Sequence, residues 1–196
     1  MTSNMFKEPI MHSLELKYPA PDFKDRSGIL MEALIRSISG QQLSVKAADT
    51  IYKRFVALFK SDTFPTAQEI VDMDDETIRS AGMSYSKIKY IKSVANAFIS
   101  DLIDVEKIRR QSDEEVIQEL IQIKGIGRWT AEMTLIFTLQ RPDVFSIGDL
   151  GLRNAITKLY GVTDHDEMIR LAEKWKPNRS AACWYLWRSL ENTPKV

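Results

Sequence analysis

The sequence predicts an all-α fold built from two helical lobes. Apolar residues recur every three or four positions along most of the chain, and residues that favour helix N-termini precede several of these runs. No stretch combines strict apolar and polar alternation with β-branched residues, the pattern expected of a half-buried strand. The 196 residues, 44% hydrophobic and 28% charged, suffice for one domain or two small lobes with a sizeable core. We therefore expect about ten short helices.

Half of these helices are expected in the first part of the chain. They span residues 29–38, 44–59, 66–71, 74–80 and 87–102. Ser44 is the expected N-cap of the second helix, and Pro65 separates it from the third. Gly82 stops the helical pattern after the fourth helix, and Ser84 precedes the fifth. This turn has the pattern of a left-handed helix stop followed by a capping serine.

The other half of the expected helices follow residue 110. They span residues 111–121, 128–139, 150–160, 166–175 and 179–190. Ser112, with Glu115 three residues later, forms a capping-box pattern at the start of the first of these. The helical pattern is interrupted after Pro142. We expect residues 1–28 and 143–196 to form one lobe and residues 29–142 to form the other.

Charge and composition exclude several classes of protein. The 27 basic and 27 acidic side chains cancel, so any basic surface for nucleic acid must be local. The single cysteine, Cys183, cannot form an internal disulfide or hold a four-cysteine iron–sulfur cluster. His12 and His165 lack metal-ligand spacing, and no glycine-rich phosphate loop is present. No signal-peptide pattern or apolar run of about 20 residues occurs, so we expect a cytoplasmic protein, or a nuclear one in a eukaryote, without a membrane partner.

The most informative motif is a glycine turn between two expected helices. Residues 123–131 read Ile-Lys-Gly-Ile-Gly-Arg-Trp-Thr-Ala. Gly125 and Gly127 can both adopt positive φ and let the backbone approach a ligand closely. The backbone amides that open the next helix, near Arg128, are then suited to bind a phosphate. The alternative is an ordinary helix–helix connection in which the glycines only turn the chain.

This motif resembles the helix-hairpin-helix of the base-excision DNA glycosylase superfamily, here at about residues 112–139. The likeness extends over about residues 30–190. It includes the Gly-Asp pair that follows the hairpin, the segment that carries a wedge residue, a second phosphate-facing turn, and a stretch similar to the alkylation-repair branch of 3-methyladenine DNA glycosylase II. In this sequence these are Gly148-Asp149 and residues 39–48, 82–87 and 175–180.

The resemblance implies a cleft between the two lobes and a monomeric protein whose partner is duplex DNA with alkylated bases. Family members that also cut the DNA strand use a lysine where this chain has Trp129, so no lyase activity is expected. Branches that hold an iron–sulfur cluster need cysteines that this chain lacks. The segment before Ile29 is too short for the extra N-terminal β domain of the larger relative in the matching branch.

The resemblance also assigns contacts with DNA. A wedge residue fills the gap that an extruded nucleotide leaves, and Gln42 is the first candidate, with Leu43 the second. Taken alone, Gln42 would be a solvated polar residue in a helix-ending turn. The residues expected to bind phosphate are Lys124, Gly125, Gly127, Arg128, Thr130, Ser84 and Lys87.

The hairpin of this family also holds a monovalent cation, Na⁺ or K⁺, through backbone carbonyls. The resemblance places these carbonyls at Ile121, Ile123 and Ile126. No other cofactor is expected.

The reaction of this family needs a carboxylate beside the sugar. Cleavage of the N-glycosidic bond builds positive charge on the deoxyribose, and a fixed carboxylate stabilises that charge or orients the attacking water. The resemblance gives this role to Asp149. Gly148-Asp149 is also a good helix N-cap, and the two roles are compatible.

An alkylated purine carries positive charge, so an electron-rich aromatic surface would bind it. Trp129 is the first candidate for the base pocket, with Met133 one turn further along the same helix and Trp175 near the end of the chain. Core packing is the alternative for each of these residues and is the expected role of Trp184 and Trp187.

Three functions are therefore in competition. The first is a monofunctional DNA glycosylase that hydrolyses alkylated purines, such as 3-methyladenine and 7-methylguanine, from DNA in base excision repair. The second is a non-catalytic module that uses the hairpin only to bind duplex DNA. The third is a helical interaction protein whose glycine turn is architectural, which the zero net charge favours.

Overall fold

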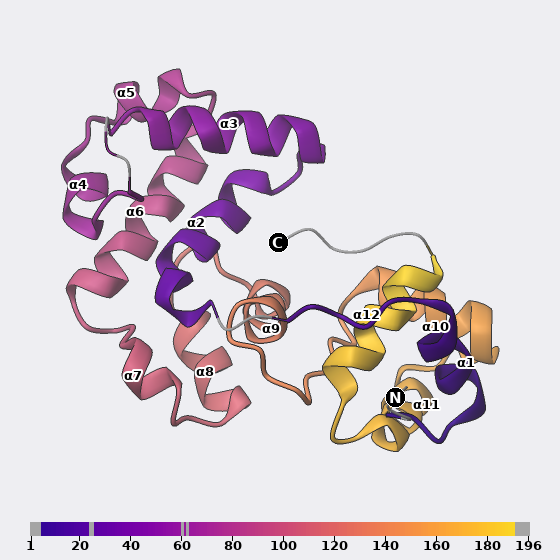
Figure 1. Cartoon of the computed structure of the whole chain (residues 1–196). Helices are drawn as coiled ribbons and strands as arrows, with labels where there is room; N and C mark the ends of the chain where they lie inside the picture. The colour runs from indigo at the N-terminus through magenta and orange to yellow at the C-terminus, as the bar shows by residue number, and fades with distance from the viewer. Residues whose placement is uncertain (1–4, 24–25, 60, 62, 191–196) are drawn as a thin grey trace. The chain divides into compact units, whose positions relative to one another are not determined.

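Helices make up every regular element of the described chain. The computed structural model describes residues 5–23, 26–59, 61 and 63–190, and within these ranges it contains α-helices and short 3-10 helices but no strand (Figure 1). The expected all-α class is confirmed. The ends of the expected terminal lobe, residues 1–4 and 191–196, lie outside the described residues.

The chain divides into two compact units. Unit 1 consists of the described residues of Met1–Asp25 and Leu135–Lys195, and unit 2 consists of the described residues of Arg26–Thr134. The boundary falls inside helix α9 (Arg128–Phe137), so this helix belongs partly to each unit. The N-terminal segment therefore groups with the C-terminal helices.

Unit 2 is built around helix α6 (Tyr85–Ile99). Its other helices are η1 (Ser27–Ile29), α2 (Leu30–Gly40), α3 (Val45–Ala57), α4 (Ala67–Asp72), α5 (Asp75–Ser80), α7 (Val105–Ile108) and α8 (Asp113–Leu120). Helix α6 packs against α2, α4 and α5, and α2 packs in turn against α3 (Figure 1). Ile88, Ile91 and Ala95 are buried on one face of α6, at the spacing of successive helical turns. This helix therefore supplies the centre of the unit 2 core.

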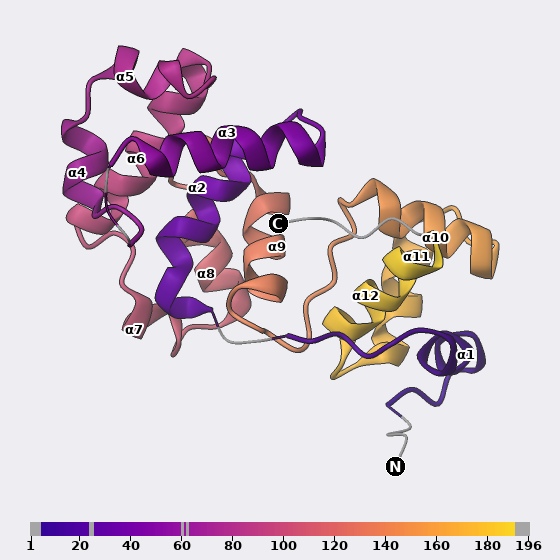
Figure 2. The same ribbon diagram turned by 45° about the horizontal axis from the view of Figure 1, so that its top comes forward.

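Unit 1 is built around helix α12 (Arg179–Ser189). Its other elements are α1 (Pro9–Lys17), α10 (Leu150–Tyr160), α11 (His165–Ala172) and η2 (Glu173–Trp175). Helix α12 packs against α1 and α10 (Figure 2). It is buried around most of its circumference, including Cys183, and Tyr185 contacts Phe6 edge to face with the ring centroids 6.1 Å apart.

The helix starts follow the capping residues of the sequence. The Ser44 hydroxyl accepts a hydrogen bond from the Ala47 amide at the start of α3. Ser112 and Glu115 form the expected capping box at the start of α8. These side chains satisfy amides that the first turn of a helix leaves without partners.

Two helices were not expected from the sequence. Helix α1 buries only Met11 and Leu14, so its apolar stripe is too short to stand out. Its start is fixed by Glu8, whose carboxylate accepts hydrogen bonds from the Ile10 and Met11 amides. Helix α7 has one turn and buries only Ile108. None of the described helices has the length and apolar character needed to cross a membrane.

Candidate functional site

The hairpin consists of α8, the turn at residues 121–127 and α9. Gly125 adopts φ +98°, and a Cβ at this position would lie 2.4 Å from Cγ of the Tyr90 ring. The Lys124 amide donates a hydrogen bond of 3.2 Å to the Ser93 hydroxyl. Tyr90 and Ser93 both belong to α6, so the glycine turn rests directly on the central helix of unit 2. Only glycine fits at position 125.

Gly127 differs from Gly125. Its φ is not positive, so of the two hairpin glycines only Gly125 uses that conformation. A Cβ at Gly127 would have no heavy atom within 4 Å. The fold itself therefore places no demand on a glycine at position 127, and the space beside its backbone is open to a ligand.

Arg128, expected to bind phosphate, is engaged by carboxylates. Its guanidinium donates to the two carboxylate oxygens of Glu114 at 3.0 and 2.7 Å, and its Nε donates to Glu132 at 3.0 Å. The hydrogen bonds from Arg128 lower the pKa of Glu114 to about 2, and those to Glu114 raise the pKa of Arg128. A phosphate would have to compete with this pair, so the structure favours a role for Arg128 in fastening α8 to α9.

Of the other predicted phosphate ligands in the hairpin, Lys124 has an exposed side chain, as such a ligand requires. The Thr130 side chain is buried. Any contact between Thr130 and a phosphate would have to come from its backbone amide in the first turn of α9.

The second predicted DNA-facing turn precedes α6. Gly82 has φ +102°, and the exposed Ser84 caps α6 by accepting a hydrogen bond from the Lys87 amide at 3.3 Å. The Lys87 ammonium is turned towards the protein: its Nζ donates to the carbonyls of Ser39 and Gln41, both at 2.8 Å. Burial lowers the pKa of Lys87. These contacts point to a role for Lys87 other than binding phosphate.

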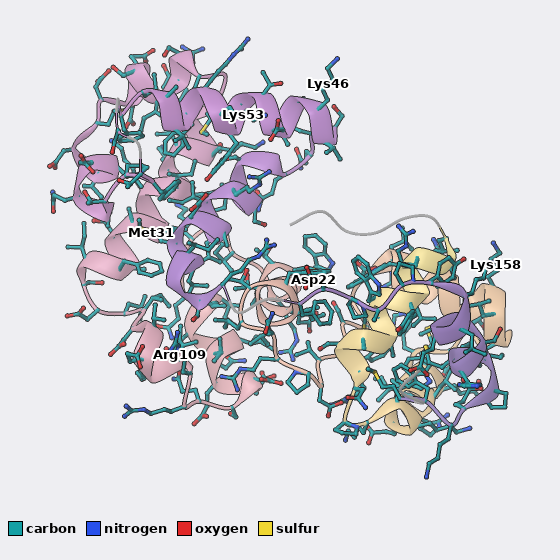
Figure 3. All side chains as sticks on the ribbon, in the orientation of Figure 1. Asp22, Met31, Lys46, Lys53, Arg109 and Lys158 are labelled. Atoms are coloured by element: carbon teal, nitrogen blue, oxygen red, sulfur yellow. The ribbon has the colours of Figure 1, made fainter. Side chains whose placement is uncertain are left out.

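The turn between α2 and α3 carries the predicted wedge residues. We call residues 41–44 the plug turn. Gln42 is exposed and has φ 60°, and Leu43 is a large apolar side chain that is 39% exposed. The Gln41 side-chain amide donates to the Gly125 carbonyl at 3.3 Å. Helix α3 follows at once, and its Lys46 extends away from the helix (Figure 3). The structure therefore joins the plug turn to the hairpin and to α6.

Asp149 lies in unit 1 and caps α10. Its Oδ1 accepts one hydrogen bond from the Leu152 amide at 2.8 Å and another from the Trp187 indole N–H at 2.9 Å. The side chain is only 8% exposed. The expected N-cap role is confirmed, and the carboxylate is held in one orientation by donors from two helices.

Two further residues shape the surroundings of Asp149. A Cβ on Gly151 would lie 3.0 Å from Asp149 Oδ1 and 3.3 Å from Cδ1 of Trp187, so glycine leaves room for their hydrogen bond. The Arg153 guanidinium donates to the carbonyls of Ile147 and Gly148 at 3.0 and 2.9 Å. It thereby fixes the loop that delivers Asp149 to the helix start.

The contact between Trp187 and Asp149 was missed in the sequence, where Trp187 was assigned to the core. Trp187 is buried and stacks on Phe137, with ring centroids 5.6 Å apart, so the core assignment is correct but incomplete. Helix α12 is apolar on most sides, and no sequence spacing distinguishes the tryptophan that reaches Asp149 from its neighbours.

The predicted base-pocket residues differ in exposure. Trp129, in unit 2, is 42% exposed at the start of α9. Met133 and Trp175 have almost no exposed surface. Trp175 contacts Phe145 and Tyr160, with ring centroids about 6 Å away. The structure thus leaves Trp129 able to meet a ligand and favours core packing for Met133 and Trp175.

Metal ligands among side chains are not apparent in the described part of the chain, where no three His, Cys, Asp or Glu residues cluster. The predicted cation site uses backbone carbonyls instead. Ile121 is the C-cap of α8, and the Ile123 carbonyl accepts a hydrogen bond from the Ile126 amide at 3.0 Å. Backbone carbonyl oxygens at a helix end are of the chemical type that a hard cation prefers.

Comparisons with known proteins identify the family of this chain. Residues 35–178 match the family described as HhH-GPD superfamily base excision DNA repair protein. The chain is 46% identical over 162 residues to DNA-3-methyladenine glycosylase 1 of Schizosaccharomyces pombe, covering 81% of this chain and 71% of that protein.

Solved structures give the same result. A 3-methyladenine DNA glycosylase of Schizosaccharomyces pombe in complex with abasic DNA has 40% identity and a TM-score of 0.78, covering 95% of this chain and 92% of that one. A DNA-3-methyladenine glycosidase of Bacillus halodurans has 33% identity and a TM-score of 0.82, covering 93% and 85%. The chain therefore belongs to the HhH-GPD superfamily of base excision DNA repair proteins.

Proposed function

We propose that this chain is a monofunctional DNA glycosylase that hydrolyses the N-glycosidic bond of alkylated purines, such as 3-methyladenine and 7-methylguanine, in duplex DNA. The similar proteins named as DNA-3-methyladenine glycosylases support this substrate class. The observation that carries the proposal is the nearly buried carboxylate of Asp149, which helix α10 and Trp187 hold in a fixed orientation.

DNA binding comes first and uses unit 2. The open space beside Gly127 lets a DNA backbone approach the amides that open α9, and the helix dipole favours a phosphate there. The exposed Lys124 adds a positive charge at the same turn. A base inside a duplex is out of reach, so the damaged nucleotide must swing out while the plug turn fills the vacated place with Gln42 or Leu43.

Hydrolysis then proceeds at C1′ of the extruded nucleotide. The C–N bond breaks and its electron pair goes to the base, so an alkylated purine that was cationic leaves as a neutral molecule without needing a proton. The Asp149 carboxylate stabilises the positive charge that develops on the sugar. Water supplies the new C1′–O bond and loses one proton, leaving an abasic site and a free base.

Two residues adapt this reaction to its substrate. Trp129 is exposed on α9, and the face of its indole ring attracts a cationic purine more than a neutral one. The same residue occupies the place where strand-cutting relatives have lysine, so the chain lacks an amine there to form a Schiff base. Water therefore remains the nucleophile, and the strand is not cut.

A monovalent cation at the hairpin is part of the proposal. The carbonyls of Ile121, Ile123 and Ile126 would hold it, and it would supply positive charge next to a DNA phosphate. Exchanging Na⁺ or K⁺ for a bulky organic cation at constant ionic strength should then weaken DNA binding.

The test combines base release with DNA retention on a methylated duplex. The native chain should release alkylated purines, and Asp149→Asn should release none while retaining DNA, because the amide keeps an oxygen for the helix cap but lacks the charge. Retention without release by the native chain would show a DNA-binding module instead. Release by Asp149→Asn at the native rate would remove Asp149 from the mechanism.

A further inference from the structure

The plug turn is anchored to both of the turns that face DNA. From the start of α6, the Lys87 ammonium reaches the Ser39 and Gln41 carbonyls, each at 2.8 Å. From the other side, the Gln41 side-chain amide reaches the Gly125 carbonyl at 3.3 Å. The segment that enters the duplex is thus bonded to the second turn and to the hairpin.

The position of Lys87 explains why it turns inward. Helix α2 ends at Gly40, and the last carbonyls of a helix have no partners within it. An ammonium group at this end satisfies two acceptors and complements the negative end of the helix dipole. Burial lowers the pKa of Lys87, as expected when its ammonium exchanges water for protein carbonyls. A phosphate ligand would instead keep its charge in solvent.

The backbone of the plug turn needs such support. Gln42 has φ 60°, a conformation that non-glycine residues adopt at an energetic cost and keep only where the surroundings hold them. The residues before it are fixed: Ser39 is buried and its hydroxyl donates to the Ile35 carbonyl at 2.8 Å. The lysine and glutamine contacts continue this support up to Gln42.

We propose that Lys87 and Gln41 are positioning residues that hold the plug turn against the two phosphate-facing turns, so that binding of the DNA backbone and filling of the vacated base site occur as one event. This inference rests on the proposed function, because it assigns the plug turn its part in nucleotide extrusion. Neither residue needs to touch DNA. The positioning is pre-formed, which lowers the ordering cost of inserting the plug.

A positioning role and a phosphate-binding role for Lys87 predict different experimental results. A lysine that neutralises a phosphate contributes about 0.9 to the slope of log affinity against log salt concentration. A lysine that holds the plug turn leaves this slope unchanged and affects extrusion of the nucleotide. Salt dependence and extrusion can be measured on the same variants.

The experiment uses the full chain and four variants. Lys87→Met removes both hydrogen bonds of the ammonium, Lys87→Arg keeps the charge and the donors, and Gln41→Met removes only the contact with Gly125. Lys89→Met is the matched control, because Lys89 is exposed on the same helix, two residues away. The substrate is a duplex with one 7-methylguanine paired with cytosine and a 2-aminopurine next to it in the same strand. The fluorescence of 2-aminopurine rises when it loses a stacking partner.

The expected result has three parts. Lys87→Met slows single-turnover base release at saturating protein by about tenfold, corresponding to the loss of hydrogen bonds from a charged donor, and reduces the fluorescence rise. Its salt slope equals that of the native chain. Lys87→Arg restores most of the rate, Gln41→Met shows a smaller loss, and Lys89→Met behaves as the native chain in rate and fluorescence.

Two outcomes would overturn the inference. The first is native release and fluorescence in Lys87→Met together with a salt slope lower by about 0.9, which would make Lys87 a phosphate ligand. The second is a native rate in Gln41→Met alongside a misfolded Lys87→Met, which would leave only a structural role. Failure of the proposed function looks different: the native chain itself releases no base, while the fluorescence change still reports on the plug turn.

Discussion

At the scale of single residues, the most informative one is Asp149, because its structural and chemical roles use the same side chain. The carboxylate caps α10 through Oδ1 and receives the Trp187 indole N–H on that same oxygen. A group fixed by two donors loses little freedom when it meets a developing positive charge. Trp187 therefore stabilises the fold and orients the group proposed to be catalytic.

Replacing Trp187 with phenylalanine separates these contributions. Trp187→Phe keeps an aromatic ring against Phe137 but removes the donor to Asp149, so we expect the free energy of unfolding to fall by about 1.5–3 kcal/mol. Base release should slow by about tenfold because the carboxylate loses one orienting contact. Urea unfolding and single-turnover kinetics measure the two effects.

The control for this change is Trp184→Phe. The Trp184 indole N–H donates to the Pro19 carbonyl at 3.2 Å, so this variant also loses one indole hydrogen bond. It should lose at most about 1 kcal/mol of stability, and its rate of base release should stay native. Equal kinetic losses in both variants would contradict the role given to Trp187.

Single residues also show which contacts could not be predicted from the sequence. The N-cap role of Asp149 could be predicted because capping is a local interaction, whereas its contact with Trp187 joins positions far apart in the chain. Lys87 was assigned to phosphate because the family resemblance places it in the second phosphate-facing turn. In the folded chain, its ammonium instead reaches the end of α2. Contacts of this kind depend on packing, which spacing does not encode.

At the scale of elements, the most informative feature is the hairpin of α8, the glycine turn and α9. Its two glycines have different explanations. Position 125 requires glycine because its φ is positive and the Tyr90 ring lies too close for a Cβ, whereas Gly127 has open space beside its backbone. The first requirement belongs to the fold. Nothing inside the protein requires glycine at position 127, as expected if a DNA backbone occupies the space beside it.

Alanine at the two positions should therefore affect different properties. Gly125→Ala should lower the free energy of unfolding by about 1–3 kcal/mol or more, through the left-handed backbone and the overlap with Tyr90. Gly127→Ala should leave stability within about 0.5 kcal/mol of the native chain and weaken duplex binding. Thermal unfolding measures the stability of both variants, and DNA titration at two salt concentrations measures their duplex affinity. Unchanged DNA affinity in Gly127→Ala would argue against a phosphate at this turn.

The ion pair between Glu114 and Arg128 gives the hairpin a pH dependence. The pKa of Glu114 is about 2 in the folded chain, below its ordinary value of 4.5. A depressed carboxyl pKa stabilises the fold fully above about pH 4.5, and this contribution disappears as the pH falls through about 2. Because both side chains of the pair are more than half exposed, it contributes less than about 1 kcal/mol to the free energy of unfolding at neutral pH.

Glu114→Gln tests this contribution and the availability of Arg128. The unfolding free energy of the variant should lie slightly below that of the native chain at pH 7 and converge with it near pH 2, as measured by urea unfolding across this range. Duplex affinity at pH 7 should rise, because a negative charge beside the hairpin is removed and the Arg128 guanidinium keeps only Glu132 as a charged partner. Glu167→Gln, on α11 of unit 1, is the charge-matched control. An equal gain in affinity by the control would show a general charge effect.

Elements are also where the sequence was most informative. Ser44, Ser84 and Ser112 mark the starts of α3, α6 and α8 because capping is a local interaction that spacing does encode. Helices α1 and α7 escaped notice because each buries too few side chains to produce a periodic pattern. A helix could be predicted from the sequence only where it buries enough apolar side chains to form a long stripe.

At the scale of the whole molecule, the zero net charge is compatible with DNA binding only if the contacts are few and local. The structure provides such places in unit 2, where the hairpin, the second turn and the plug turn are joined by hydrogen bonds. The proposed catalytic carboxylate belongs to unit 1. The proposed DNA contacts and the proposed catalytic carboxylate thus belong to different units of one chain.

The products of the complete reaction distinguish a pure glycosylase from a strand-cutting one. With Trp129 in place of lysine, borohydride should trap no covalent complex between the native chain and DNA that carries an alkylated purine, as seen on a denaturing gel. Trp129→Lys is the informative partner, since an amine at this position could attack C1′. A trapped adduct with the native chain would contradict the monofunctional assignment.

The most direct measurement is mass spectrometry of the bases freed from alkylated genomic DNA. The native chain should release 3-methyladenine and 7-methylguanine well above the spontaneous loss seen without protein, and Asp149→Asn should not exceed that loss. A native chain that retains the DNA but frees no alkylated base beyond the protein-free sample would contradict the proposed activity.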